Sequence, residues 1–176
     1  MQYRNLGKSN LQVSRLCLGT MMFGDQTPRE EAAAIVADAH AQGVNYIDTA
    51  DVYTKGASET MLGELLRGQR HHWVLATKLG NPMSDRVNEA HYSRSWMLRE
   101  VEASLGRLQT DHVDILYLHR DYNGMNLEER PAGARCHAAR GQDPLLGRLQ
   151  FSGLAHHGAG APGPADGHAR AGGVPA

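Results

Sequence analysis

Short apolar runs alternate with amphipathic stretches along the first two thirds of this chain. The amphipathic stretches carry apolar residues three and four positions apart, which is the spacing of a helix with one buried face. The apolar runs have the length of buried strands, and they occupy residues 16–18, 44–48, 73–78 and 113–119. Strand and helix therefore alternate three times before a fourth strand, and such alternation is typical of parallel strands joined by right-handed crossovers.

Local signals mark where the first predicted helix begins and ends. Thr27 is a candidate N-cap, Pro28 suits the first helical position, and Glu30 completes a capping box. The helix is expected to run to about Gln42, with Gly43 as its stop. Its predicted buried face consists of Ile35, Val36 and Ala39.

The two later helices have similar signals. Ser58 is the candidate cap of the second helix and Gly68 its end, and Ser93 or Arg94 opens the third. The predicted buried stripes are Met61, Leu62, Leu65 and Leu66 in the second helix, and Leu98, Val101, Leu105 and Leu108 in the third. Ahead of the first apolar run, residues 3–7 and 11–14 are predicted to form a hairpin.

Polar residues stand at the ends of three predicted strands. One strand ends at Asp48, the next at Lys78 and the last at His119, and Tyr53 follows the first of them by five positions. In a parallel barrel such strand ends meet on the face that carries the chemistry. Taken singly, Asp48 is compatible with capping a turn, Lys78 with solvation and His119 with a satisfied strand end. Their joint placement favours a functional site.

These residue types suit protonation of a carbonyl oxygen as a hydride arrives. Tyrosine is a poor acid at neutral pH, with an ordinary pKa of about 10, and a nearby ammonium stabilises its phenolate. Lys78 is the candidate ammonium, and Asp48 is expected to hold it in place. His119 is a candidate to donate to, or orient, the carbonyl oxygen, which leaves Tyr53 as the proton donor.

Two glycines bound the turn after the first apolar run, Gly19 and Gly24. They allow a sharp bend or a close approach to a ligand, and a plain turn between strand and helix is an equally good interpretation. The turn does not match Gly-x-Gly-x-x-Gly. The dinucleotide-binding fingerprint of a doubly wound sheet, which is the competing layout, is therefore absent.

Four motifs have the order and spacing of a known family. They are 18–24, 47–53 with Ser58-Glu59, 76–78 and 114–119. Through these motifs the chain from Tyr3 to about Glu129 resembles the first half of the aldo-keto reductases. Within that family it is similar to the bacterial branch that includes general-stress reductases and relatives of potassium-channel β subunits.

The resemblance implies an α/β fold, an incomplete (β/α)8 TIM barrel whose first four β/α units are formed by residues 1–129. It implies NADPH as the hydride donor and a small-molecule aldehyde or ketone as the substrate. The implied catalytic tetrad consists of Tyr53 as the acid with Asp48, Lys78 and His119. The residues implied to border the nicotinamide are Gly19, Thr20, Met21 and Asp48. A non-catalytic interaction protein and a different (β/α)8 enzyme with a phosphate site are the alternatives.

Charge and cysteine content narrow the range of partners. The net charge is −1 and the pI is about 6.8, so no nucleic-acid or membrane partner is expected. Residues 1–10 lack the apolar core of a signal peptide, and no apolar run is long enough to span a bilayer. Cys17 and Cys136 are the only cysteines, which gives no metal spacing and makes a cytoplasmic location the expectation. The oligomeric state is left open.

Residues 130–176 differ sharply in composition from the rest of the chain. Of these 47 residues 26 are Gly, Ala or Pro, and none is Ile, Met, Lys, Tyr or Trp, so the segment is expected to lack a packed core and to be disordered. A one-base shift of the reading frame is one interpretation, because residues 142–151 in a shifted frame are compatible with a fifth strand and its Ser-Asn cofactor contact. A natural Gly/Ala/Pro-rich tail is the other. Since the family's later cofactor contacts are not visible, carbonyl reduction by this form is expected to be impaired.

Overall fold

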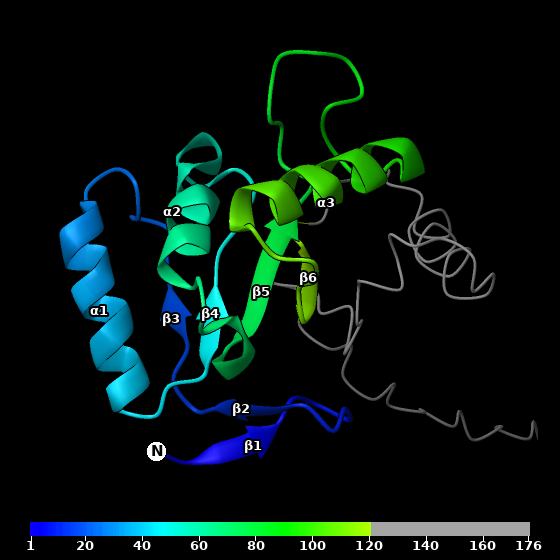
Figure 1. The fold of residues 1–176 in the computed structure, drawn as a ribbon. Coiled ribbons are helices and arrows are strands. Elements are labelled where there is room, and N and C mark those ends of the chain that lie inside the picture. The colour runs from blue at the N-terminus through cyan, green and yellow to red at the C-terminus, as the bar shows by residue number, and fades with distance from the viewer. Residues whose placement is uncertain (121–176) are drawn as a thin grey trace, which may run out of the picture.

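A four-stranded parallel sheet organises residues 1–120, which are the part of the chain that the computed structural model describes (Figure 1). Its strands are β3 (Leu18–Gly19), β4 (Tyr46–Asp48), β5 (Val74–Leu79) and β6 (Ile115–Leu118), and they lie side by side in that order. The order in the sheet follows the order in the chain, without the reversal that defines a doubly wound sheet. The described residues therefore have the layout of consecutive strands of a barrel.

Three helices and a hairpin surround the sheet. The helices are α1 (Arg29–Ala41), α2 (Ala57–Leu65) and α3 (Arg94–Leu108), with short 3-10 turns η1 (Tyr53–Gly56) and η2 (Arg70–His72) between them. The predicted hairpin is present as the antiparallel pair β1 (Tyr3–Asn5) and β2 (Gln12–Ser14), which crosses beneath one end of the sheet in Figure 1.

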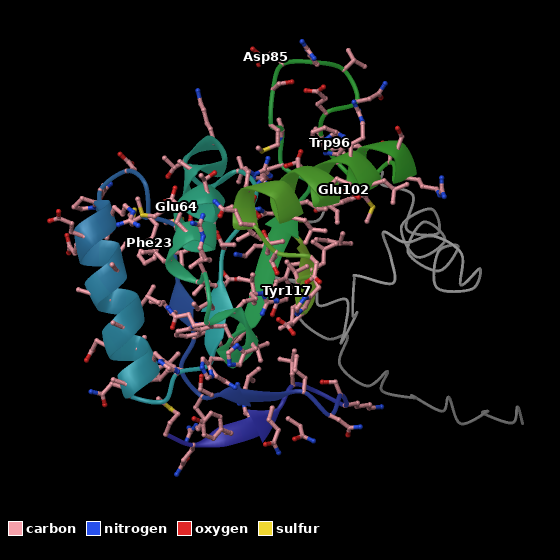
Figure 2. All side chains as sticks on the ribbon, viewed as in Figure 1. Phe23, Glu64, Asp85, Trp96, Glu102 and Tyr117 are labelled. Atoms are coloured by element: carbon pink, nitrogen blue, oxygen red, sulfur yellow. The ribbon has the colours of Figure 1, made fainter. Side chains whose placement is uncertain are left out.

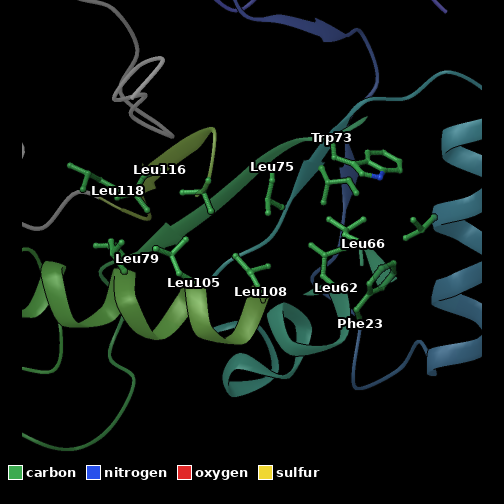
Figure 3. Packing of buried hydrophobic residues seen from close by; sticks show 14 of the residues in the cluster. Phe23, Leu62, Leu66, Trp73, Leu75, Leu79, Leu105, Leu108, Leu116 and Leu118 are labelled. Atoms are coloured by element: carbon green, nitrogen blue, oxygen red, sulfur yellow. The ribbon is translucent and has the colours of Figure 1, made fainter. Parts of the chain in front are cut away.

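Side chains of each strand alternate between the two faces of the sheet, as the pleat requires. Figure 3 shows Leu75, Leu79 and Leu116 on the face that packs against α2 and α3. The opposite face carries a smaller cluster, which Val13 of the hairpin covers: Val74, Ala76, Ile115 and Tyr117. Burial on both faces explains why the strands appear in the sequence as continuous apolar runs.

Two predicted helix caps are wrong. Helix α1 begins at Arg29 with Pro28 as its N-cap and without a side-chain cap, so Thr27 forms no capping box. Helix α2 begins one residue before Ser58, which is buried and donates its hydroxyl to the Thr20 carbonyl at 2.7 Å. The predicted cap of α3 is confirmed, because the Ser93 hydroxyl accepts from the Trp96 amide at 3.3 Å.

The buried stripe of α3 differs by one residue from the predicted one. Val101, Leu105 and Leu108 lie in the core as predicted, but Met97 takes the place expected for Leu98, which is half-buried. The observed stripe runs in steps of four residues from Met97 through Val101 to Leu105 and then in a step of three to Leu108, which keeps it on one side of the helix. The loop between β5 and α3 extends away from the sheet, with Asp85 near its tip (Figure 2).

The predictions for residues 130–176, and the boundary at residue 129, lie outside the described residues. Within residues 1–120 no helix combines the length and apolar character that crossing a bilayer requires.

Candidate active site

The Lys78 ammonium is the centre of the group of polar residues at the ends of β4 and β5. It donates to the Asp48 carboxylate, to the Thr49 carbonyl at 2.9 Å and to the Tyr53 hydroxyl at 3.0 Å. The Lys78 side chain is only 6% exposed. Because its three donor hydrogens have three oxygen partners, the ammonium is fixed in position beside the phenol.

Strand register explains why Lys78 meets Asp48. Asp48 pairs with Ala76 in the sheet, and Lys78, two residues further along β5, lies on the same face as Ala76. The chain after β4 keeps following β5, because the Thr49 amide donates to the Ala76 carbonyl and the Asp51 amide to the Lys78 carbonyl, both at 3.0 Å. Asp48, at the end of β4, therefore lies within reach of Lys78, which is two residues further along β5.

A left-handed turn carries Tyr53 over the lysine. Thr54 and Lys55 have φ angles of 49° and 52°, and Gly56 follows with 89°. Positive φ is uncommon for a residue other than glycine and a genuine outlier for a β-branched one, so this turn stores strain next to Tyr53. The Lys78 ammonium also lies 4.7 Å from the centre of the Tyr53 ring. The strained turn thus directly follows the residue whose phenol lies against the ammonium.

His119 completes the group predicted from the strand ends. It follows β6, and its amide donates to the Leu79 carbonyl at 2.9 Å. Its ring meets the Tyr53 ring edge-on, with the ring centres 5.8 Å apart and the planes at 86°. The structure thus brings Asp48, Tyr53, Lys78 and His119 together at the carboxyl ends of neighbouring strands, and their chemical roles remain predictions.

The first turn of the chain lies beside this group. Gly19 pairs with Asp48 in the sheet, and the position that a side chain of Gly19 would occupy has no atom within 4 Å. Met21 is 54% exposed, whereas Thr20 is fully buried and its hydroxyl is bonded to the Asp48 carbonyl and the Ser58 hydroxyl, both at 3.1 Å. Gly19 and Met21 are therefore accessible to a ligand. The buried Thr20 side chain anchors the turn between them to Asp48 and Ser58.

A buried ionic network, which the sequence did not reveal, lies behind the site. Arg107 donates to Glu59 at 2.7 Å, to Glu100 at 2.5 Å and to Ser104 at 3.0 Å. Glu59 also accepts from the Thr77 hydroxyl at 2.6 Å, one residue before Lys78. The network thereby ties α2 and α3 to the strand that carries the lysine. Its only signal in the sequence is that Glu59 and Glu100 fall at helix positions that should be apolar.

Asp51 is a fourth buried titratable group in this region. Its Oδ1 accepts from the Val52 amide at 2.6 Å, and its Oδ2 has no partner among the described residues. Burial, together with the charges of Glu100 and Glu59, raises the pKa of Asp51 to about 8. Burial also raises the pKa of Glu100. The raised pKa therefore favours the protonated form of Asp51 at neutral pH.

In the described part of the chain, no group of three or more His, Cys, Asp or Glu side chains is arranged to hold a metal ion. The polar atoms of the site are those of an ammonium, a carboxylate, a phenol and an imidazole. Such a set can deliver and replace a proton on an oxygen atom that develops negative charge.

Comparisons with known proteins give an independent view of the chain. The model of the Aldo/keto reductase family matches residues 15–130. An uncharacterized oxidoreductase of Bacillus subtilis is 38% identical over 131 residues, which are 73% of this chain and 42% of the relative. A probable voltage-gated potassium channel subunit beta of Arabidopsis thaliana is 39% identical over 135 residues, 73% of this chain and 40% of the relative.

Solved structures give the same result for the fold. The holo form of an aldo-keto reductase from Bacillus halodurans matches with a TM-score of 0.71 and 35% identity, covering 80% of this chain and 47% of that one. A putative aldo-keto reductase from Pseudomonas aeruginosa matches with a TM-score of 0.71 and 38% identity, covering 88% and 60%. The chain spans about two fifths of the length of the two sequence relatives. The predicted barrel-type α/β fold is confirmed.

Proposed function

This chain belongs to the aldo/keto reductase family, and on that basis we propose that it is an NADPH-dependent oxidoreductase that reduces aldehydes and ketones to alcohols. The observation that carries the proposal is the Lys78 ammonium, which donates both to the Asp48 carboxylate and, at 3.0 Å, to the Tyr53 hydroxyl. The oxidoreductase name of the Bacillus relative supports the same reaction class. We further propose that the protein acts in the cytoplasm.

In this proposal Tyr53 gives its proton to the carbonyl oxygen of the substrate. Lys78 stabilises the phenolate that remains, because an ammonium at hydrogen-bonding distance favours the charged form of its neighbour. Asp48 keeps Lys78 in place, and the edge of the His119 ring limits the directions from which an oxygen approaches Tyr53.

The residues around Gly19 fit a flat cofactor ring. The open space over Gly19, the exposed side chain of Met21 and the half-buried Asp48 form one surface at the edge of the group. We propose that NADPH binds with its nicotinamide against Gly19, Met21 and Asp48, and that Thr20 supports this surface from behind. When bound, the cofactor supplies the hydride. The holo form of the Bacillus halodurans neighbour supports a cofactor in this family.

The test is reduction of a simple aldehyde by the purified chain, followed by oxidation of NADPH and, in parallel, of NADH. We expect slow turnover with NADPH, because reduction by this form is expected to be impaired, and a further loss of about 100- to 10,000-fold in Tyr53→Phe, which keeps the ring and removes the proton donor. Tyr3→Phe is the matched control, since the Tyr3 hydroxyl donates to the Gly43 carbonyl at the far end of the sheet. Equal turnover by the wild type and Tyr53→Phe overturns the assignment.

A second candidate function comes from the likeness to the Arabidopsis channel subunit. On this view the chain is a non-catalytic interaction protein. Titration with NADPH separates the two functions, because binding detected by quenching of tryptophan fluorescence favours the reductase. Absence of binding and turnover, together with capture of a channel protein, favours the interaction function.

A further inference from the structure

The Tyr92 hydroxyl holds both peptide groups of a single residue next to the candidate site. It donates to the Arg120 carbonyl at 2.6 Å and accepts from the Arg120 amide at 3.0 Å. Tyr92 is 3% exposed and lies immediately before Ser93, the cap of α3. The start of α3 is thus tied to the chain directly after His119.

The bond is made at the point where pairing within the sheet stops. Strand β6 ends at Leu118, and the last ladder bond beyond it runs from the His119 amide to the Leu79 carbonyl at 2.9 Å. Peptide groups beyond the end of a strand need another partner if they are to stay fixed. For Arg120 that partner is a side chain from a different element, and it engages the amide and the carbonyl together.

Gly80 makes this contact possible. A Cβ atom at Gly80 would lie 2.2 Å from Cε1 of Tyr92, so the phenol ring packs directly on the main chain at the end of β5. Gly80 has a φ of 120°, which L side chains rarely adopt, and its carbonyl accepts from the His91 amide at 2.8 Å. Gly80, Tyr92 and Arg120 form one unit, which we call the Tyr92 clamp.

The clamp acts on a residue whose position matters for the proposed chemistry. The His119 ring contacts Tyr53 only through a perpendicular edge, at 5.8 Å between ring centres. Rotation of the main chain at His119 would move this ring away from Tyr53 and Lys78. The ladder bond of His119 restrains one side of the residue, and the Tyr92 clamp restrains the other.

We propose that Tyr92 is a positioning residue for His119, which it keeps edge-on against Tyr53 by fixing the peptide groups of Arg120. The inference rests on the proposed reductase function, in which His119 borders the reacting oxygen. A displacement of about 1 Å at such a group can lower a rate by roughly 100-fold. Tyr92 is proposed to act through the main chain of Arg120.

The first experiment compares Tyr92→Phe with Tyr3→Phe in the full chain. Each variant removes one tyrosine hydroxyl bonded to the main chain, and Tyr3 lies in the hairpin far from the site. We expect kcat for a simple aldehyde to fall by about 10- to 100-fold in Tyr92→Phe, with KM changed less than about twofold and with Tyr3→Phe unchanged. Equal kcat in both variants overturns the proposal.

A double variant distinguishes positioning from general loosening of the fold. If Tyr92 acts through His119, Tyr92→Phe causes no further loss of kcat in a His119→Ala background, because the two effects are not independent. If Tyr92 serves stability alone, the losses multiply and follow the fall in the urea midpoint, and the proposal is wrong.

Two readouts do not depend on turnover. In the wild-type chain the Arg120 amide, which lies beyond the end of β6, is expected to exchange with solvent at least about tenfold more slowly than an unprotected amide. The His119 ring resonances should shift in Tyr92→Phe and remain in place in Tyr3→Phe. If the wild type shows no reductase activity, the proposed function fails while these readouts still test the clamp. An unprotected Arg120 amide overturns the proposal, even where Tyr92→Phe does not fold.

Discussion

Arg107 and Glu59 form an ion pair of 2.7 Å between α3 and α2, in which the Glu59 side chain has no exposure to solvent. Glu59 sits near the start of α2, directly after the turn that carries Tyr53, and its other oxygen accepts from Thr77 in β5. The pair therefore joins the Tyr53 turn, the lysine strand and α3. Its contribution should appear both in stability and in the geometry of the site.

Removal of Arg107 should destabilise the fold strongly. Arg107→Met leaves two buried carboxylates, Glu59 and Glu100, without their cation, and breaking a buried pair in this way costs about 3–5 kcal/mol. Arg29→Met is the control, because the Arg29–Glu64 pair is exposed and such pairs contribute about 0–1 kcal/mol. Urea unfolding measures both variants, and similar losses would contradict the special role of the buried network.

Asp51 should make the protein less stable as the pH rises from about 4 to about 8. Its pKa is raised to about 8 in the folded chain, so unfolding in this range releases a proton, and a higher pH favours the unfolded state. Asp51→Asn should remove this part of the pH dependence, while the exposed control Asp25→Asn should leave it intact. Urea midpoints measured between pH 5 and pH 9 test the sign, and parallel curves for wild type and Asp51→Asn would refute it.

Replacement of Lys78 should strongly reduce the rate of the proposed reaction, whereas replacement of a remote lysine should not. Lys78→Met removes the ammonium beside the Tyr53 hydroxyl and leaves the Asp48 carboxylate without its cation. Loss of this assistance to proton transfer is expected to lower kcat by about 100-fold or more. Lys8→Met, in the exposed turn of the hairpin, should retain full activity. Retained turnover in Lys78→Met would show that Tyr53 works without the ammonium.

Two helical glycines should respond in opposite ways to alanine. A Cβ at Gly63 would lie 2.6 Å from the Leu108 main chain, where α2 and α3 are in close contact, so Gly63→Ala should destabilise the fold by about 1–3 kcal/mol. Gly106 in α3 has nothing within 4 Å, so Gly106→Ala should stabilise it by about 0.5–1 kcal/mol through helix propensity alone. Calorimetry or urea unfolding measures the change in stability of both variants. If Gly63→Ala stabilised the fold as Gly106→Ala does, the α2–α3 contact would have relaxed around the added methyl group.

The sequence was sufficient for the parts of this fold that depend on local pattern. Alternation of strand and helix predicted the parallel sheet. The positions of Asp48 and Lys78 at strand ends predicted that the two side chains meet, because the register of paired strands is regular. The predicted cap at Ser58 failed for a tertiary reason, because its hydroxyl bonds to Thr20, whereas the structure gives no such partner for Thr27 among the described residues. A favourable local motif was overridden by a partner distant in the chain.

The residues that sequence reasoning missed act through contacts between distant elements. Arg107 and Glu59 are 48 positions apart, and Tyr92 and Arg120 are 28 apart, so no short motif joins them. The charged residues at apolar helix positions were a usable signal, because a charge is buried only with a partner. Tyr92 gave no signal, since a tyrosine in a polar loop before a helix is compatible with many environments.

The order β3-β4-β5-β6 also has a consequence for the way in which the protein is made. Within residues 1–120, each strand of this sheet after β3 pairs with the strand before it, so these ladders close loops of moderate length. A chain leaving the ribosome can add one strand and one helix at a time to the sheet already formed. Asp48 and Lys78, which are 30 positions apart, would then both leave the ribosome before α3, and His119 would follow as the last of the four site residues. Assembly of the candidate site would thus proceed in the direction of translation.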